Sequence, residues 1–192
     1  MLIIIIVRKT RSFFSRLCHL NSTLRCYARA IGDPQVSIAS GCAFESDVIL
    51  KATDGGEIRI GKNVKISDHV KIVAQGACVV IGDGVFIGSG SIIVAREGIE
   101  IGNESLIAEH VVIRDQDHRT DSYPIQNAGY RAAAIHIGCD VCIGCKASIL
   151  RGATVGDRCV IGAHALVKSR IPDDMLAVGV PARVVKRIEG SQ

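Results

Sequence analysis

An aliphatic residue returns every six positions over most of this 192-residue chain. Residues 135–170 show the pattern in six consecutive hexads, IHIGCD-VCIGCK-ASILRG-ATVGDR-CVIGAH-ALVKSR, where glycine often follows the aliphatic residue. A period of six matches neither the 3.6-residue repeat of a helix nor the two-residue repeat of a strand, so it indicates a stacked repeat architecture. The hexad positions along the chain are Ile38, Phe44, Leu50, Ile60, Ile66, Ile72, Ile81, Ile87, Ile93, Ile101, Ile107, Ile113, Ile137, Ile143, Ile149, Val155, Ile161 and Val167.

Extra residues enter the repeat only after every third hexad, which divides the hexads into triplets. Three short strands therefore make one turn of a triangular coil, and every insertion leaves the coil at the same corner. The sequence predicts an all-β protein, a parallel β-helix of about six triangular coils over residues 32–171, with successive strands about 4.8 Å apart. We expect the hexad residues to point inward and the glycines to lie at corners, because glycine tolerates a positive φ. Residues 172–192 form a C-terminal tail in this division.

Residues 1–31 carry six arginine or lysine residues and no acidic residue, within a chain of net charge +4. Their apolar residues recur at helical spacing, which predicts a short basic amphipathic helix. Such a helix caps the β-helix, docks on an anionic membrane surface, or does both. The apolar run over residues 2–7 is too short for a membrane span or a secretory signal, so we expect a cytoplasmic protein that can contact the inner membrane face. The modest net charge argues against a nucleic-acid partner.

The longest insertion, residues 114–136, is the first candidate for chemistry, because long polar loops on rigid scaffolds often carry function. Histidine suits proton transfer at neutral pH, since its ordinary pKa is about 6.5. A solvated surface loop without chemistry is the alternative. The loop places His118 among Asp115, Asp117, Asp121, Tyr123 and Tyr130.

The cysteine and histidine spacings do not predict a metal site. The run C-x-x-C-x-x-C over residues 139–145 looks like a zinc motif, but the hexad phase sends its cysteines toward different sides of the triangle. His69, His110 and His164 share one phase in alternate coils, about 10 Å apart, which is too far for one zinc ion. We therefore expect no metal.

Residues 32–188 resemble the hexapeptide-repeat acyltransferases, and most of all the O-acetyltransferases that act on maltose, galactoside, capsule and O-antigen sugars. The resemblance is strongest over residues 135–167 and in IPDDMLAVGVPARVVKRI, where GVPAR (Gly179–Arg183) is a signature of that branch. It implies a left-handed β-helix and transfer from acetyl-CoA, with His118 as the general base that takes a proton from an acceptor hydroxyl. The candidates to orient His118 or to bind the acceptor are Asp115, Asp117, Asp121, Glu109, Tyr123 and Tyr130.

The resemblance also implies that coenzyme A binds in the groove between neighbouring subunits of a homotrimer. Basic side chains at matching positions suit the anionic phosphates. The sequence departs from the family in two places: Cys142 stands where the relatives usually have Trp, and Lys168-Ser169 stands where they usually have Thr-Lys. The matching positions are Cys145, Ala163, Lys168, Arg183 and Lys186.

The expected function is acetyl transfer to a sugar hydroxyl in the biosynthesis of a surface polysaccharide. Two alternatives stay open, namely N-acetylation of a nucleotide-linked amino sugar and a non-catalytic scaffold subunit that binds no coenzyme A. Carbonic anhydrases of the γ type share the fold, but they need two zinc-binding histidines closer in sequence than His110 and His118, which are eight positions apart.

Overall fold

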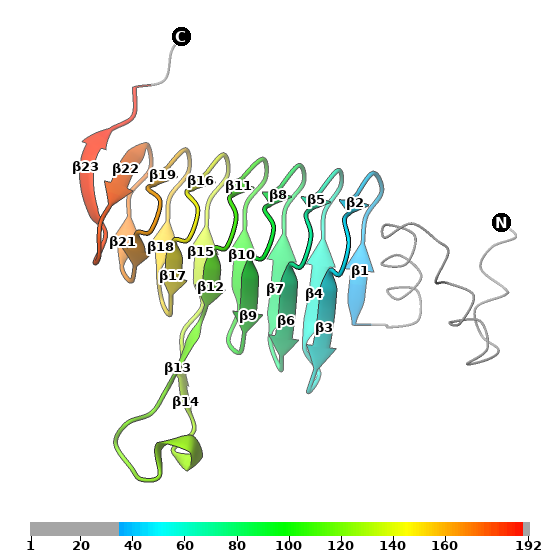
Figure 1. Ribbon diagram of the computed structural model, residues 1–192, viewed down its shortest axis with the longest axis vertical. Helices are drawn as coiled ribbons and strands as arrows, with labels where there is room; N and C mark the ends of the chain where they lie inside the picture. Colours follow the sequence, from blue (N-terminus) through cyan, green and yellow to red (C-terminus); the bar gives the residue numbers. More distant parts are fainter. Residues whose placement is uncertain (1–34, 190–192) are drawn as a thin grey trace, which may run out of the picture.

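A computed structural model describes residues 35–189 and shows a parallel β-helix with three flat faces (Figure 1). This confirms the fold class predicted from the hexads. The helix expected over residues 1–31 lies outside the described residues. Within residues 35–189, no helix is long and apolar enough to cross a membrane.

Each face of the β-helix is one sheet whose strands come from successive coils. Face A contains β1 (Val36–Ile38), β4 (Glu57–Ile60), β7 (Cys78–Ile81), β10 (Ile99–Ile101), β15 (Ile135–Ile137), β18 (Thr154–Val155) and β21 (Arg170–Ile171). Face B contains β2 (Ala43–Phe44), β5 (Lys65–Ile66), β8 (Phe86–Ile87), β11 (Leu106–Ile107), β16 (Cys142–Ile143), β19 (Val160–Ile161), β22 (Met175–Val178) and β23 (Arg183–Arg187). Face C contains β3 (Ile49–Thr53), β6 (Lys71–Gln75), β9 (Ile92–Ala95), β12 (Val112–Arg114), β17 (Ser148–Leu150) and β20 (Leu166–Val167).

Strands within each face are parallel, except that β23 reverses and pairs antiparallel with β22 at the C-terminal end. We name each corner by the faces that it joins in chain order, so the chain passes an A–B, a B–C and a C–A corner in every coil. The longest insertion leaves at the C–A corner between β12 and β15, as the sequence predicted. It contains β13 (Gln116–His118), the 3₁₀ turn η2 (Ile125–Asn127) and β14 (Tyr130–Ala132).

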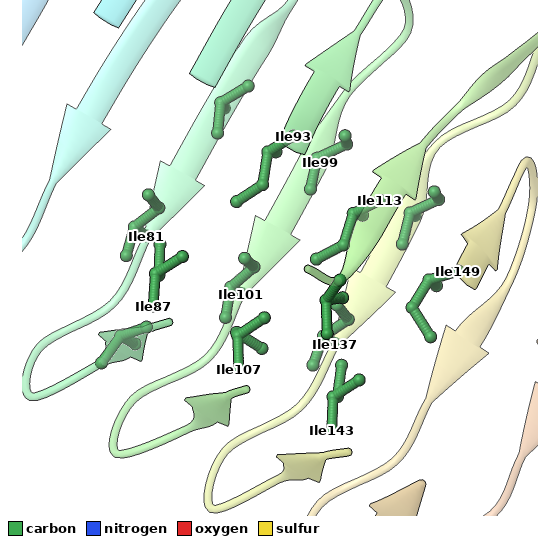
Figure 2. Close-up of a cluster of buried hydrophobic side chains, with 14 of the residues drawn as sticks. Ile81, Ile87, Ile93, Ile99, Ile101, Ile107, Ile113, Ile137, Ile143 and Ile149 are labelled. Carbon is green, nitrogen blue, oxygen red and sulfur yellow. The ribbon is translucent and has the colours of Figure 1, made fainter. Parts of the chain in front are cut away.

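The hexad residues form three columns inside the triangle, and each column runs from coil to coil along the β-helix (Figure 2). Face A stacks Ile81 on Ile101 and Ile101 on Ile137, and the other two faces stack their hexad residues in the same way. All of the hexad residues are buried except Ile38 and Leu50, which are partly exposed in the first coil and pack against the core. Because stacked aliphatic side chains fill the inside of the triangle, the chain fills its core with few aromatic residues.

The glycines that follow hexad residues have a different role from the predicted one. Their φ values are not positive, and the left-handed residue comes two positions later, for example Asp140 with a φ of 54° after Gly138 and Lys146 with a φ of 60° after Gly144. Glycine is needed instead because neighbouring coils approach closely. A Cβ atom at Gly102 would lie 2.5 Å from the carbonyl carbon of Gly138, and one at Gly144 would lie 2.5 Å from the nitrogen of Ala163.

Candidate functional site

The candidate site is the loop that leaves the C–A corner after β12 and stands away from the β-helix (Figure 1). Its two arms, β13 and β14, pair in antiparallel fashion, with His118 opposite Tyr130 and Asp117 opposite Arg131. A short antiparallel ladder gives the base of the loop a defined conformation, so His118 lies on an ordered strand.

The buried carboxylate of Asp115 fixes the start of the loop to the coil beneath it. Its Oδ2 accepts hydrogen bonds from the backbone N–H groups of Glu97 and Gly98, both at 2.8 Å, and its Oδ1 accepts one from the N–H of Arg96 at 2.9 Å. The side chain is fully buried, and its backbone oxygen accepts a hydrogen bond from the N–H of Ala133 at 3.0 Å. Asp115 therefore ties the two arms of the loop to the turn that joins β9 and β10.

Two further carboxylates that the sequence offered as partners of His118 bind arginines instead. Arg151, which follows β17 on the next coil, donates from Nε to the Oδ2 of Asp117 at 2.9 Å. Asp121 accepts hydrogen bonds from Arg119 at 2.8 Å and from Arg131 at 3.1 Å.

The hydrogen bond from Arg119 is the main reason why the pKa of Asp121 lies well below its usual range. Glu109 lies at the B–C corner, a different corner from the loop, where its backbone oxygen accepts a hydrogen bond from the N–H of Lys146. Within one chain, these three carboxylates are thus committed to other partners or placed elsewhere.

His118 is exposed, and its closest described partner is an aromatic ring. The centroids of the His118 and Tyr130 rings are 4.4 Å apart, with the planes tilted by 41°. The guanidinium carbon of Arg96 lies 3.9 Å from the centroid of the Tyr130 ring. Tyr123 lies farther out on the loop and is 87% exposed.

The residues expected to contact coenzyme A lie at other places on the surface of the same chain. Cys145 and Ala163 occupy the B–C corner in successive coils. The two coils are joined there by a hydrogen bond of 2.9 Å from the His164 N–H to the backbone oxygen of Cys145. Lys168 is exposed at the C–A corner after β20. Because the B–C corner is separated from the loop by the full width of face C, one chain alone does not bring Cys145 and His118 together.

The basic positions at the C-terminus belong to β23, at the edge of face B. Arg183 and Lys186 are exposed, and Arg183 pairs with Val178 while Lys186 pairs with Leu176. Arg187 and Arg158 both bind the carboxylate of Asp174, at 3.2 and 2.6 Å. Arg158 is the main cause of the lowered pKa of Asp174. On this strand, Arg183 and Lys186 are thus the basic residues that do not bind Asp174.

The cysteines follow the phase predicted from the hexads. Cys159 is buried and its Sγ lies 2.9 Å from the carbonyl oxygen of Pro172, whereas Cys139 is exposed. Burial raises the pKa of the Cys142 and Cys159 thiols. Among residues 35–189, no three His, Cys, Asp or Glu side chains gather in a way that could hold a metal ion.

Sequence reasoning did not single out Arg96 and Arg151, which contact the loop from the coils on either side of it. Both follow a face C strand at the C–A corner; Arg96 lies in a short insertion there, whereas Arg151 lies where the repeat continues without one. The hexad register predicts that both arginines lie at the C–A corner. It does not predict which residues they bind, because the path of a loop outside the repeat is not fixed by a period.

Two family models match the repeat. Residues 134–169 match the bacterial transferase hexapeptide (six repeats), and residues 78–114 match the hexapeptide repeat of succinyl-transferase. A probable acetyltransferase of Mycobacterium tuberculosis is 42% identical over 68% of this chain and 44% of its own length. The galactoside O-acetyltransferase of Escherichia coli is 32% identical over 67% of this chain and 63% of its own length. The chain therefore spans less than two thirds of each of these two relatives.

Solved structures share the fold. AntD, an N-acyltransferase from Bacillus cereus, in complex with dTDP and 3-hydroxybutyryl-CoA, has a TM-score of 0.70 at 22% identity, covering 80% of this chain and 83% of that one. The polySia-specific acetyltransferase NeuO has a TM-score of 0.56 at 26% identity, covering 83% and 90%. The period of six, the stacked triangular coils and these relatives agree, and the chain belongs to the hexapeptide-repeat transferases.

Proposed function

We propose that this protein is an O-acetyltransferase that moves the acetyl group of acetyl-CoA to a sugar hydroxyl, with His118 as the general base. The observation that carries the proposal is the exposed imidazole of His118 on a loop whose base is fixed by the buried Asp115. The names of the relatives, which are acetyltransferases, support the reaction class.

The reaction needs one group that holds a proton briefly. The imidazole of His118 takes the proton from the acceptor hydroxyl as that oxygen attacks the thioester carbonyl. The carbon–sulfur bond then breaks, and the imidazolium returns the proton to the departing coenzyme A thiolate. Histidine suits both steps, because its ordinary pKa of about 6.5 lets it accept and release a proton near neutral pH. No acetyl-enzyme forms in this scheme.

Exposed cations on the C-terminal coils suit the phosphates of coenzyme A. Lys168, Arg183 and Lys186 are exposed and are candidates for those phosphates. Cys145 and Ala163 present a narrow corner where the coils stack closely, which suits the thin pantetheine chain. Acetyl-CoA is a substrate here, and no metal is required in the proposed chemistry.

A homotrimer completes the proposed site. His118 and the B–C corner residues lie at different corners of one chain, so a second chain must bring its B–C corner to the loop. A trimer with a three-fold axis parallel to the β-helix would repeat this contact three times. Light scattering is expected to give three times the 20.4 kDa of one chain. A monomer that transfers acetyl groups at full rate would contradict this assembly.

The proposed acceptor is a sugar of a surface polysaccharide or its precursor. The putative lipopolysaccharide biosynthesis O-acetyl transferase WbbJ of Escherichia coli, 28% identical over 69% of this chain and 72% of its own length, supports this acceptor class together with the galactoside enzyme. The N-acyltransferase AntD, below 25% identity, supports the fold alone. An amino-sugar nucleotide is therefore the competing acceptor in the test.

A peripheral membrane location is part of the proposal, through the basic apolar residues 1–31. Anionic lipid attracts a basic segment, whereas neutral lipid does not. The full chain is expected to sediment with vesicles that contain phosphatidylglycerol and to stay in solution with phosphatidylcholine vesicles. Equal sedimentation with both, or with neither, would contradict a membrane role for residues 1–31.

The test of the proposed function is release of the coenzyme A thiol, followed with a thiol reagent against a panel of sugars, oligosaccharides and amino-sugar nucleotides. Direct transfer predicts intersecting initial-velocity lines when acetyl-CoA and acceptor are varied together. Parallel lines would indicate an acetyl-enzyme and would contradict the proposed mechanism. Activity only with amino-sugar nucleotides would contradict the proposed O-acetylation and indicate N-acetylation instead. The absence of acetyl-CoA binding would favour a scaffold subunit without catalysis.

A further inference from the structure

We propose that Arg96 is a positioning residue for the general base. Its guanidinium holds the ring of Tyr130, and that ring holds the imidazole of His118 in the orientation that proton transfer requires. The inference rests on the function proposed above, and it adds to it a residue from outside the loop. We call Arg96, Tyr130 and His118 the ring clamp.

The geometry of the ring clamp is set by backbone register. His118 and Tyr130 face each other across the β13–β14 ladder, so the antiparallel pairing brings their rings to a centroid separation of 4.4 Å. Directly opposite residues in an antiparallel pair are the ones whose side chains interact. The contact between the two rings therefore follows from the ladder and needs no unusual side-chain conformation.

Arg96 approaches from the coil beneath the loop. Its guanidinium carbon lies 3.9 Å from the centre of the Tyr130 ring, which is the geometry of a cation–π contact. Its Nε atom is buried and has no hydrogen-bond partner in the described part of the chain. Among residues 35–189 no carboxylate pairs with this guanidinium, so the ring of Tyr130 is its principal described partner.

Asp115 holds both ends of the ring clamp. Its carboxylate accepts a hydrogen bond from the backbone N–H of Arg96, and His118 follows it by three residues at the end of β13. The buried carboxylate of Asp115 therefore fixes the backbone of Arg96 and the start of the strand that carries His118. An exposed histidine without such contacts would sample several rotamers, and only a fraction of them would face the acceptor.

Kinetics of four variants test the positioning role. Tyr130→Leu and Arg96→Gln are each expected to lower kcat about tenfold, equivalent to about 1.4 kcal/mol, with little change in the KM for acetyl-CoA. Tyr130→Phe keeps the ring and should recover most of the kcat that Tyr130→Leu loses, and Arg96→Lys should recover part of the loss of Arg96→Gln. The matched control is Arg59→Gln, which removes an exposed arginine that pairs with Glu57 far from the loop.

The double variant Arg96→Gln with Tyr130→Leu separates a clamp from two independent effects. Because both substitutions disable the same contact, the double variant is expected to be no slower than Tyr130→Leu alone. A loss of about a hundredfold in the double variant, or an unchanged kcat in Tyr130→Leu, would overturn the proposal.

NMR of the histidine rings gives a readout that does not depend on activity. The chain has six histidines, and the resonances of His118 are identified as those missing from His118→Asn. The ring current of Tyr130 should displace them from the position of a free histidine, and Tyr130→Leu should return them to it, while Arg59→Gln leaves them unmoved. His118 resonances at the free position in the wild type would overturn the ring clamp. A displaced resonance in a protein without acetyl transfer would instead overturn the proposed function.

Discussion

The substitution Gly102→Ala tests the close stacking of the two coils between which the loop is inserted. The added methyl group would lie 2.5 Å from the carbonyl carbon of Gly138 and 2.7 Å from the nitrogen of Cys139. Carbon atoms in contact prefer about 3.5–4.0 Å, so the coils must separate locally by about 1 Å. Since the obstacle is backbone, relief must strain the hydrogen bond from the Gly102 N–H to the Ile137 oxygen, now 2.8 Å.

The size of the effect follows from this clash. Overpacking costs about 1–3 kcal/mol, and an immovable backbone obstacle places Gly102→Ala in the upper half of that range. For a domain of about 150–250 residues, each kcal/mol lowers Tm by about 2–4 °C, so we expect a decrease of about 4–12 °C.

Thermal unfolding followed by circular dichroism measures the effect, at equal protein concentration because assembly adds to stability. The control is Gly98→Ala, where the nearest atoms to the new methyl would be 3.8 and 4.0 Å away. This control adds the same group near the same loop and should leave Tm almost unchanged. Equal melting temperatures for the two variants would refute the close approach of the coils and the reason given for the repeated glycines.

Three further predictions concern charge and thiol chemistry. The pKa of Asp174 is lowered, chiefly by Arg158, so the folded state binds fewer protons than the unfolded state in the acid range. The stability that ionised Asp174 contributes is present above about pH 4 and is lost as the pH falls below that value. The Tm difference between wild type and Asp174→Asn should therefore become smaller as the pH is lowered. Iodoacetamide should alkylate the exposed Cys139 well before the buried Cys159, whose pKa is raised, as measured by mass spectrometry of peptides. Asp117→Asn removes an exposed ion pair and should change stability by less than about 1 kcal/mol in urea unfolding while it lowers kcat, because it frees one arm of the loop.

Each of these predictions has a clear contrary result. A Tm difference for Asp174→Asn that stays constant or grows below about pH 4 would contradict the lowered pKa. Alkylation of Cys159 before Cys139 would contradict the inward position of Cys159 and the outward position of Cys139 that the hexads predict. A large loss of stability in Asp117→Asn would show that its ion pair supports the fold itself rather than the loop.

The hexad period was sufficient to predict the fold. It located the core positions, the corner at which the loop leaves, and the shared phase of His69, His110 and His164, because a repeated coil applies the same constraint at every turn. The predicted role of the glycines was wrong, since the sequence shows which residue is small but not which neighbouring backbone requires it. The stacking distance at Gly102 became visible only in three dimensions.

The candidate site was predictable only in part. The composition of the loop pointed to His118, but three carboxylates beside it in sequence turned out to serve other partners. Asp115 anchors the loop, while Asp117 and Asp121 pair with arginines. The partners of Asp121 lie within the loop, whereas Asp115 and Asp117 bind Arg96 and Arg151 from the coils below and above it, which are distant in sequence.

The most direct test of the central claim is the kcat for acetyl transfer in His118→Asn, measured beside His69→Asn with the best acceptor from the panel. Both variants replace an exposed histidine by the same uncharged residue, and His69 lies at the B–C corner of an early coil, away from the loop. If His118 is the general base, His118→Asn loses about 10²–10⁴-fold in kcat, His69→Asn keeps the wild-type rate, and both bind acetyl-CoA as the wild type does. A His118→Asn enzyme that turns over at the rate of His69→Asn would contradict the account.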